Sequence, residues 1–125
     1  MKLVIGGACQ GKLRYVMESG GFSEESVARG DTLPLEDFCE KPVLWGLHLL
    51  VRRLLEAGRE PQAWLETHCR MEEMTFLCDE VGCGVVPIRR EDRDWREAVG
   101  RLCCRLAARS EEVVRVYAGL AQRIK

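Results

Sequence analysis

The sequence predicts a three-layer α/β domain, in which a mainly parallel β-sheet lies between helices. Three observations indicate this fold class. Short apolar runs alternate along the chain with segments of helical periodicity. A glycine-rich turn joins the first apolar run to the first helical segment, and 125 residues is a common size for one domain. We therefore expect residues 1–125 to form a single domain without internal repeats.

The first part of the chain reads as a strand, a turn and a helix. Leu3 to Ile5 is a short apolar run that ends at two glycines. From Gly11 to Ser19 apolar residues recur at helical spacing, and the next two glycines end this helix. Residues 22–42 are polar and contain Gly and Pro, so we expect mostly loop, with a short strand before Asp31.

Two helices are expected in the middle of the chain. The run "VLWGLHLLVRRLLEAG" begins after Pro42, ends at Gly58, and places five apolar residues on one helical face: Leu44, Leu47, Val51, Leu54 and Leu55. The second helix is expected over residues 60–73. Pro61 falls in its first turn, where the missing N–H group removes no hydrogen bond.

The last third predicts a buried strand, a long helix and a final strand. Met74 to Cys78 is apolar and is followed by Asp79 and Glu80, as expected for a parallel strand with charges at its carboxyl end. Residues 81–87 form a glycine-punctuated loop. Residues 91–109 carry a stripe typical of an amphipathic helix, made by Trp95, Val99, Leu102, Cys103 and Leu106. Residues 111–120 are expected to form the last strand, followed by a short tail.

Composition excludes several classes of function. A formal net charge of −1 gives no electrostatic basis for binding nucleic acid or an anionic membrane. No apolar run approaches the roughly 20 residues that span a bilayer, and the first residues do not resemble a signal peptide, so a cytoplasmic location is expected. The seven cysteines contain no C-x-x-C pair, and spacing gives little support to a zinc site made from Cys39, Cys69, His48 and His68. The residues that would ligate a metal ion cannot be assigned from the sequence.

The turn after the first strand has the spacing of a phosphate-binding loop. Gly6 and Gly11 are separated by four residues, and Lys12 follows. In such loops backbone N–H groups surround a phosphate, the helix N-terminus adds positive charge, and the lysine reaches the β- and γ-phosphates. We therefore predict that a nucleotide or another phosphate compound is bound by Gly6, Gly7, Ala8, Cys9, Gln10, Gly11, Lys12 and Leu13.

Leu13 departs from this pattern, because functional loops place Ser or Thr here to ligate Mg²⁺. Either another group or water completes the shell of a bound Mg²⁺, or the chain binds phosphate without efficient transfer. Glu80, which follows the buried strand, is the second candidate catalytic residue beside Lys12, since a carboxylate there can hold Mg²⁺ through water or polarise a hydroxyl. The alternative is that Asp79 and Glu80 merely prefer solvent.

Three segments together resemble a known family. "IGGACQGK", "DEVGCGVVP" and "VVRVYAGLAQRIK" are similar to segments of the bifunctional adenosylcobinamide kinase/adenosylcobinamide-phosphate guanylyltransferase of cobalamin biosynthesis. The resemblance covers about the first 16 residues and most of 74–125, and extends only loosely to the middle through "VLWGLHLLVRRLL". It implies a P-loop NTPase-like domain with fewer strands than the family has, a GTP or ATP substrate, an acceptor hydroxyl on a corrinoid, and a homo-oligomer, for which the stripe of residues 91–109 offers an interface.

The resemblance assigns residues 6–12 to the phosphate loop and Glu80 to the glutamate of the second motif. Leu13 stands where the family has Ser, and Asp79 stands where it has Asn. The family's guanylylated histidine lies in a His-x-x-Arg-Arg-Pro-like helix that nothing in this chain matches. His48, in an apolar helix, is expected to be a packed or rim histidine, and neither it nor His68 inherits the nucleophile's role.

Three hypotheses remain open from the sequence. The first is an enzyme of the kinase or nucleotidyltransferase class, with kinase-type phosphoryl transfer in cobalamin biosynthesis and without a basis for guanylyl transfer. The second is a degenerate, non-catalytic nucleotide-binding partner protein, which Leu13 favours. The third is a structural domain that binds no ligand.

Overall fold

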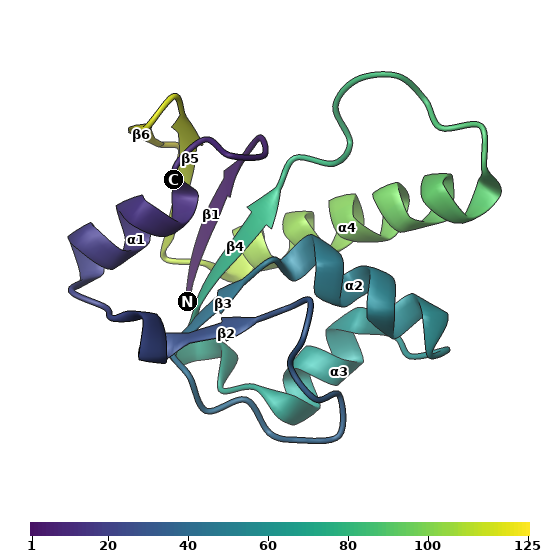
Figure 1. Cartoon of the computed structure of the whole chain (residues 1–125), viewed down its shortest axis with the longest axis horizontal. Helices are drawn as coiled ribbons and strands as arrows, with labels where there is room; N and C mark the ends of the chain where they lie inside the picture. The colour runs from purple at the N-terminus through teal and green to yellow at the C-terminus, as the bar shows by residue number, and fades with distance from the viewer.

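The computed structural model describes residues 1–125. The centre of its fold is a six-stranded sheet that lies between helices (Figure 1). The strand order is β2-β3-β4-β1-β5-β6. All neighbouring strands are parallel except β5 and β6, which are antiparallel. The strands are β1 (Lys2–Gly6), β2 (Val27–Arg29), β3 (Val43–Trp45), β4 (Thr75–Asp79), β5 (Glu112–Tyr117) and β6 (Leu120–Arg123).

Helices cover both faces of the sheet, so the predicted three-layer α/β class is confirmed. The helices are α1 (Lys12–Gly20), α2 (Leu47–Glu56), α3 (Pro61–His68) and α4 (Arg90–Arg109), with 3₁₀ turns at Glu24–Ser26 and Met71–Glu73. Figure 1 shows α1 on one side of the sheet and the other three helices on the opposite side. This arrangement, with a glycine loop between β1 and α1, is that of a P-loop NTPase-like domain.

Alternation along the central strands builds two separate cores. On β4, Phe76 and Cys78 belong to the larger core beneath α2, α3 and α4, whereas Leu77 belongs to the smaller core beneath α1. On β1, Leu3 and Val4 divide in the same way. Side chains on a strand point alternately to opposite faces, so a central strand buried on both faces is apolar throughout.

The helix expected after Pro42 is wrong at its start. Val43–Trp45 form β3, and α2 begins only at Leu47. Val43 and Leu44 are fully buried between β2 and β4, where parallel pairing satisfies their backbone groups. Gly46, with a φ of 74°, makes the turn from strand to helix that a side chain would oppose.

Two other boundaries differ from the expectation. The helix predicted over residues 60–73 ends at His68, after which Cys69 pairs with Cys39 in an isolated parallel bridge. The predicted last strand and tail are a hairpin, in which β5 turns through Ala118 and Gly119 into β6. Both turn residues have positive φ, 51° and 77°, as a two-residue type I′ turn requires. The expected short strand before Asp31 is confirmed as β2.

The apolar stripe of the long helix packs against the larger core of the same chain. Val99, Leu102 and Leu106 of α4 are buried in the larger core, so this stripe supplies no free interface for an oligomer. None of the helices combines the length and the apolar character needed to cross a bilayer.

We predict that Gly30→Ala destabilises the fold by about 1–3 kcal/mol, the usual cost of overpacking. A Cβ at this position would lie 2.2 Å from the carbonyl oxygen of Gly46, and backbone must move to relieve the contact. Gly100→Ala is the matched control: its Cβ meets nothing within 4 Å, and alanine in a helix is favoured over glycine by about 0.5–1 kcal/mol. Urea unfolding should show opposite shifts of the two midpoints, and equal shifts would contradict the assigned packing.

Candidate phosphate site at the carboxyl edge of the sheet

Residues 7–11 form the loop between β1 and α1, and their backbone N–H groups have no backbone acceptor. Cys9 and Gly11 have φ values of 57° and 93°, so residues with positive and negative φ alternate along this part of the loop. Such alternation turns consecutive N–H groups toward one concave side, which is a recurrent anion-binding arrangement. The first residues of α1 follow directly, so its positive end faces the same place.

The β5–β6 turn supports this loop from outside. The N–H of Gly119 donates to the carbonyl oxygen of Gln10 at 2.9 Å, and the N–H of Ala118 donates to Oε1 of the Gln10 side chain at 2.6 Å. Gly6 passes so close to β5 that a Cβ there would lie 2.4 Å from the carbonyl oxygen of Val116. Glycine at position 6 is therefore required by packing, apart from any ligand.

Lys12 is the buried cation of the site, with 6% of its surface exposed. Its Nζ donates to the carbonyl oxygens of Gly7 at 2.6 Å and Gly6 at 3.2 Å, and lies 2.7 Å from Oδ1 of Asp79. An ammonium has three donors, and these three acceptors use all of them. The side chain is thereby held beneath the loop.

Asp79 is in turn held by His48 of α2. The backbone N–H of Asp79 donates to Nδ1 of His48 at 3.2 Å, and Nε2 of His48 lies 3.4 Å from Oδ2 of Asp79. Since Nδ1 accepts, the proton of the neutral ring is on Nε2, which faces the carboxylate. Burial lowers the pKa of His48 below its ordinary value of 6.5, opposed by Asp79 and reinforced by Lys12. Trp95 of α4 holds the first turn of α2 in place, because its Nε1 donates to the carbonyl oxygen of His48 at 2.7 Å.

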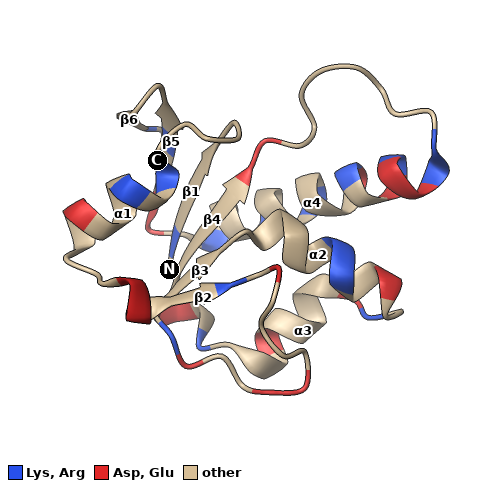
Figure 2. Ribbon diagram, in the orientation of Figure 1, with Lys and Arg blue, Asp and Glu red and all other residues tan.

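Glu80 lies at the same edge but has a different partner. Both of its carboxylate oxygens accept from Arg115 of β5, at 2.8 and 3.0 Å. The N–H of Glu80 donates to the carbonyl oxygen of Gly6 at 2.9 Å, which places the residue beside the start of the loop. The bidentate pair raises the pKa of Arg115. In Figure 2 the carboxyl end of β4 is acidic and lies at the same edge of the sheet as the phosphate loop.

Leu13 offers no polar group to a phosphate or a metal ion. It is partly buried and packs against the smaller core formed by Val4, Val16, Val43, Leu77, Val114 and Val116. The chain thus supplies no hydroxyl at the position where Mg²⁺ is usually held. No three His, Cys, Asp or Glu side chains lie close enough to hold a metal ion.

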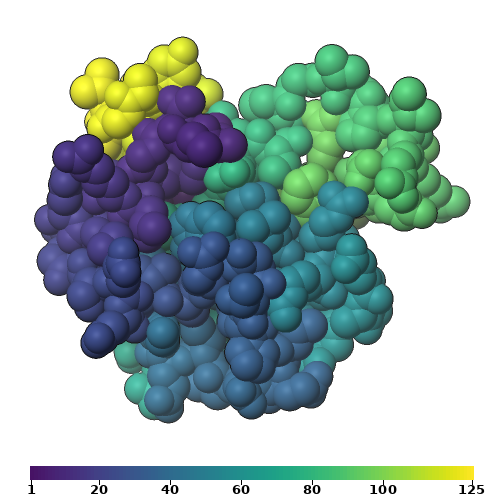
Figure 3. Space-filling view, in the orientation of Figure 1, coloured from purple at the N-terminus to yellow at the C-terminus, as the bar shows by residue number.

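The segment after β4 stands away from the body of the protein (Figure 3). Val85 and Ile88 are each 93% exposed. Arg96 of α4 donates to the carbonyl oxygens of Val85 and Gly82, each at 2.6 Å, and Arg93 donates to those of Pro87 and Ile88. The arginines near the start of α4 therefore order this segment.

The structure brings together more than the sequence indicated. Lys12 and the loop residues 6–11 lie where they were predicted, while the carboxylate in contact with Lys12 is Asp79, and Glu80 remains a neighbouring candidate. His48 is packed, as expected, but its bonds to Asp79 were missed. The alternation of side chains along β4 could have indicated the role of Asp79. Asp79 lies on the same face of β4 as Leu77, and α1, the helix that carries Lys12, covers that face.

We predict that His48→Leu costs about 1–3 kcal/mol at pH 8, because the N–H of Asp79 loses its acceptor. The difference between wild type and variant should shrink as the pH falls below 6.5. The folded-state pKa of His48 is lowered, so its contribution is present above the unfolded-state pKa and is lost as protonation favours the unfolded chain. Urea midpoints between pH 8 and 5.5 measure this. His68→Gln, a control outside the site, should keep the wild-type pH dependence.

The comparisons with known proteins agree with the family resemblance. The model of the family described as cobinamide kinase / cobinamide phosphate guanyltransferase matches residues 44–124, well over half of the chain. A relative from Salmonella typhimurium, the bifunctional adenosylcobalamin biosynthesis protein CobU, is 40% identical over 53 residues. That match covers 42% of this chain and 29% of the relative. The matched range of the family model includes Asp79, Glu80 and the β5–β6 hairpin but not residues 6–13. The chain belongs to the cobinamide kinase / cobinamide phosphate guanyltransferase family.

Proposed function

We propose that the chain binds the triphosphate of GTP or ATP through the N–H groups of residues 7–11 and the ammonium of Lys12. The observation that carries this proposal is the run of five consecutive N–H groups without a backbone acceptor, beside a buried cation. Backbone donors that point to one side next to a positive charge and a helix N-terminus form a recurrent anion-binding arrangement. A terminal phosphate would take the place of the loop carbonyls as acceptor for Lys12.

We further propose kinase-type phosphoryl transfer to a hydroxyl of a corrinoid, cobinamide being the acceptor named for the family. Lys12 would balance charge on the transferred group, and its bond to Asp79 would hold it in place. Asp79 is the carboxylate nearest to that cation, and Glu80 remains a candidate for orienting the acceptor hydroxyl. Mg²⁺, when bound with the nucleotide, neutralises phosphate charge; this chain offers it Asp79 and no hydroxyl at position 13.

Guanylyl transfer is not part of the proposal, because neither histidine presents a free ring nitrogen at the loop. Both ring nitrogens of His48 face groups of Asp79, and the residue is 7% exposed. His68 stacks on Trp64 with ring centroids 4.5 Å apart, and its Nδ1 lies 3.0 Å from the Trp64 carbonyl oxygen.

The packing of Leu13 supports a second candidate, a nucleotide-binding partner protein without catalysis. The leucine side chain is partly buried and packs against the core beneath α1. A loop whose hydroxyl has been exchanged for a core residue keeps its backbone donors and loses a metal ligand.

Calorimetry with GTP, ATP and GDP, each with and without Mg²⁺, tests binding. Incubation with cobinamide and the bound nucleotide, followed by mass spectrometry of the corrinoid, tests transfer. Binding with phosphorylated cobinamide supports the kinase, and binding without any product supports the partner protein. No heat with any nucleotide would overturn both and favour a domain without a ligand.

A further inference from the structure

Two cysteines far apart in sequence lie side by side near the edge of the sheet that β2 forms. Cys39 and Cys69 are partners in an isolated parallel β-bridge, and the N–H of Cys39 donates to the carbonyl oxygen of His68 at 2.7 Å. Both are buried, with 8% and 6% of their surface exposed. Paired residues on adjacent parallel strands are about 4.8 Å apart and point to the same face. That spacing lies within the range of roughly 4.4–6.8 Å between Cα atoms that a disulfide spans.

The two thiols are not equivalent. A hydrogen bond from the Cys69 thiol lowers the pKa of Cys39 to about 7, and the backbone N–H and the ammonium of Lys41 contribute in the same direction. The same contact and burial raise the pKa of Cys69. Cys39 is therefore the thiol of the pair that ionises more readily, and the thiolate is the form that attacks disulfides.

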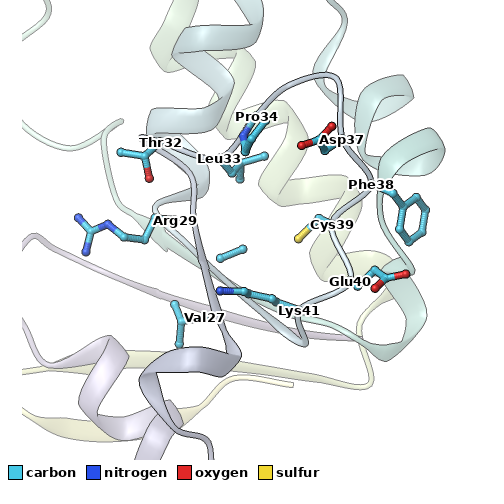
Figure 4. Close-up of a pocket in the computed structure, with 11 residues that line it drawn as sticks. Val27, Arg29, Thr32, Leu33, Pro34, Asp37, Phe38, Cys39, Glu40 and Lys41 are labelled. Carbon is cyan, nitrogen blue, oxygen red and sulfur yellow. The ribbon is translucent and has the colours of Figure 1, made fainter.

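A cavity gives solutes access to Cys39. It has a volume of about 560 Å³ and lies between the edge strand β2 and the segment that leads to β3. In Figure 4 the sulfur of Cys39 points into this cavity, with Lys41 and Val27 on one side and Leu33 on the other. The cavity holds neither Lys12 nor Asp79, so it is separate from the phosphate site.

We propose that Cys39 and Cys69 are a redox-responsive dithiol that is oxidised by low-molecular-weight disulfides such as oxidised glutathione. The Cys39 thiolate attacks one sulfur of the reagent, which forms a mixed disulfide and releases the first glutathione thiolate. The Cys69 thiol then loses its proton to solvent and attacks the Cys39 sulfur, which expels the second glutathione thiolate. Both glutathione thiolates take up protons, so one oxidised glutathione and two thiols become one protein disulfide and two glutathione molecules.

A second thiol pair serves as an internal comparison. Cys78 of β4 and Cys103 of α4 also influence one another, which raises the pKa of Cys78 and lowers that of Cys103. Cys78 is fully buried between the strand and the helices, and neither residue lines the cavity beside β2. Because only Cys39 is reached through the cavity, the Cys39–Cys69 pair should be oxidised before the Cys78–Cys103 pair.

The experiment incubates the full chain with increasing ratios of oxidised to reduced glutathione at pH 7.5, then blocks free thiols with N-ethylmaleimide and digests with trypsin. Mass spectrometry should find the peptide of residues 30–52 linked to that of residues 60–70. Linkage between the peptides that carry Cys78 and Cys103 at lower ratios, or alkylated Cys39 and Cys69 throughout, would overturn the proposal. This readout uses wild-type protein and does not depend on a variant folding.

Two variants identify the attacking thiol. Cys69→Ser should retain glutathione on Cys39 as a trapped mixed disulfide, whereas Cys39→Ser should leave Cys69 unmodified; the reverse pattern would overturn the assigned order. The oxidised wild type should also unfold at a temperature roughly 10 °C higher than the reduced form, because the bridge closes a loop of about 30 residues. An unchanged Tm in protein shown to carry the linkage would contradict the geometry of the bridge.

Discussion

Lys12→Ala is expected to weaken the binding of GTP or ATP by roughly 100-fold or more. Hydrogen bonds to charged groups contribute about 1.5–3 kcal/mol each, and the ammonium is placed to make at least two such bonds to a triphosphate. The change also leaves Asp79 without its cation at the loop, so phosphate then meets an uncompensated negative charge. Calorimetry of wild type and variant with the same nucleotide measures the effect.

The control for this change is Arg14→Ala. Arg14 is also a cation in the first turn of α1, but its side chain is 82% exposed and pairs with Glu18. Its removal should alter affinity by less than a few-fold, since exposed pairs contribute little. Wild-type affinity in Lys12→Ala would show that the loop is not the nucleotide site, and equal losses in both variants would indicate only a general effect of charge.

Leu13→Ser is expected to raise Mg²⁺-dependent turnover of nucleotide with cobinamide by roughly 10- to 100-fold, the size of effect that ligand-shell changes have on metal sites. The serine hydroxyl would supply the ligand that phosphate loops use to hold the metal. The same change removes a side chain from the core beneath α1 and should cost about 1–2 kcal/mol of stability. Initial rates at varied Mg²⁺ and urea midpoints measure the two effects.

Leu13→Ala separates these effects, because it removes the same packing without adding a hydroxyl. It should match the stability of Leu13→Ser and show no gain in turnover. If the wild type has no activity and only the serine variant gains it, the chain is a binding protein that lost its metal ligand. If the serine variant shows no Mg²⁺ response while binding nucleotide, position 13 does not face the metal.

The parts of the fold that could be predicted were those that a local pattern determines. The glycine spacing before Lys12 placed the end of β1, the loop and the start of α1 correctly. The Val43–Trp45 strand could not be told from a helix, because a short apolar run suits either element and only its position between β2 and β4 decides.

The site needed information on which strands are neighbours. Asp79 meets Lys12 because β4 lies beside β1 with Gly6 opposite Asp79, a register that no single segment reveals. His48 joins them because β3 is the next strand along, which sets the start of α2 near the end of β4. Glu80 was favoured from the sequence since it matches the family motif, whereas its bond to Arg115 depends on β5 lying on the other side of β1.

The support of the loop by the β5–β6 turn has a consequence for how the protein is made. Gln10 and Ala118, which share a hydrogen bond, are separated by 108 positions. A ribosome therefore releases the loop well before the turn that supports it, since chains are synthesised at only about 5–20 residues per second. The nascent chain therefore carries residues 7–11 for several seconds before the β5–β6 turn exists, and Gln10 gains its contacts with Ala118 and Gly119 only after the intervening residues have left the ribosome.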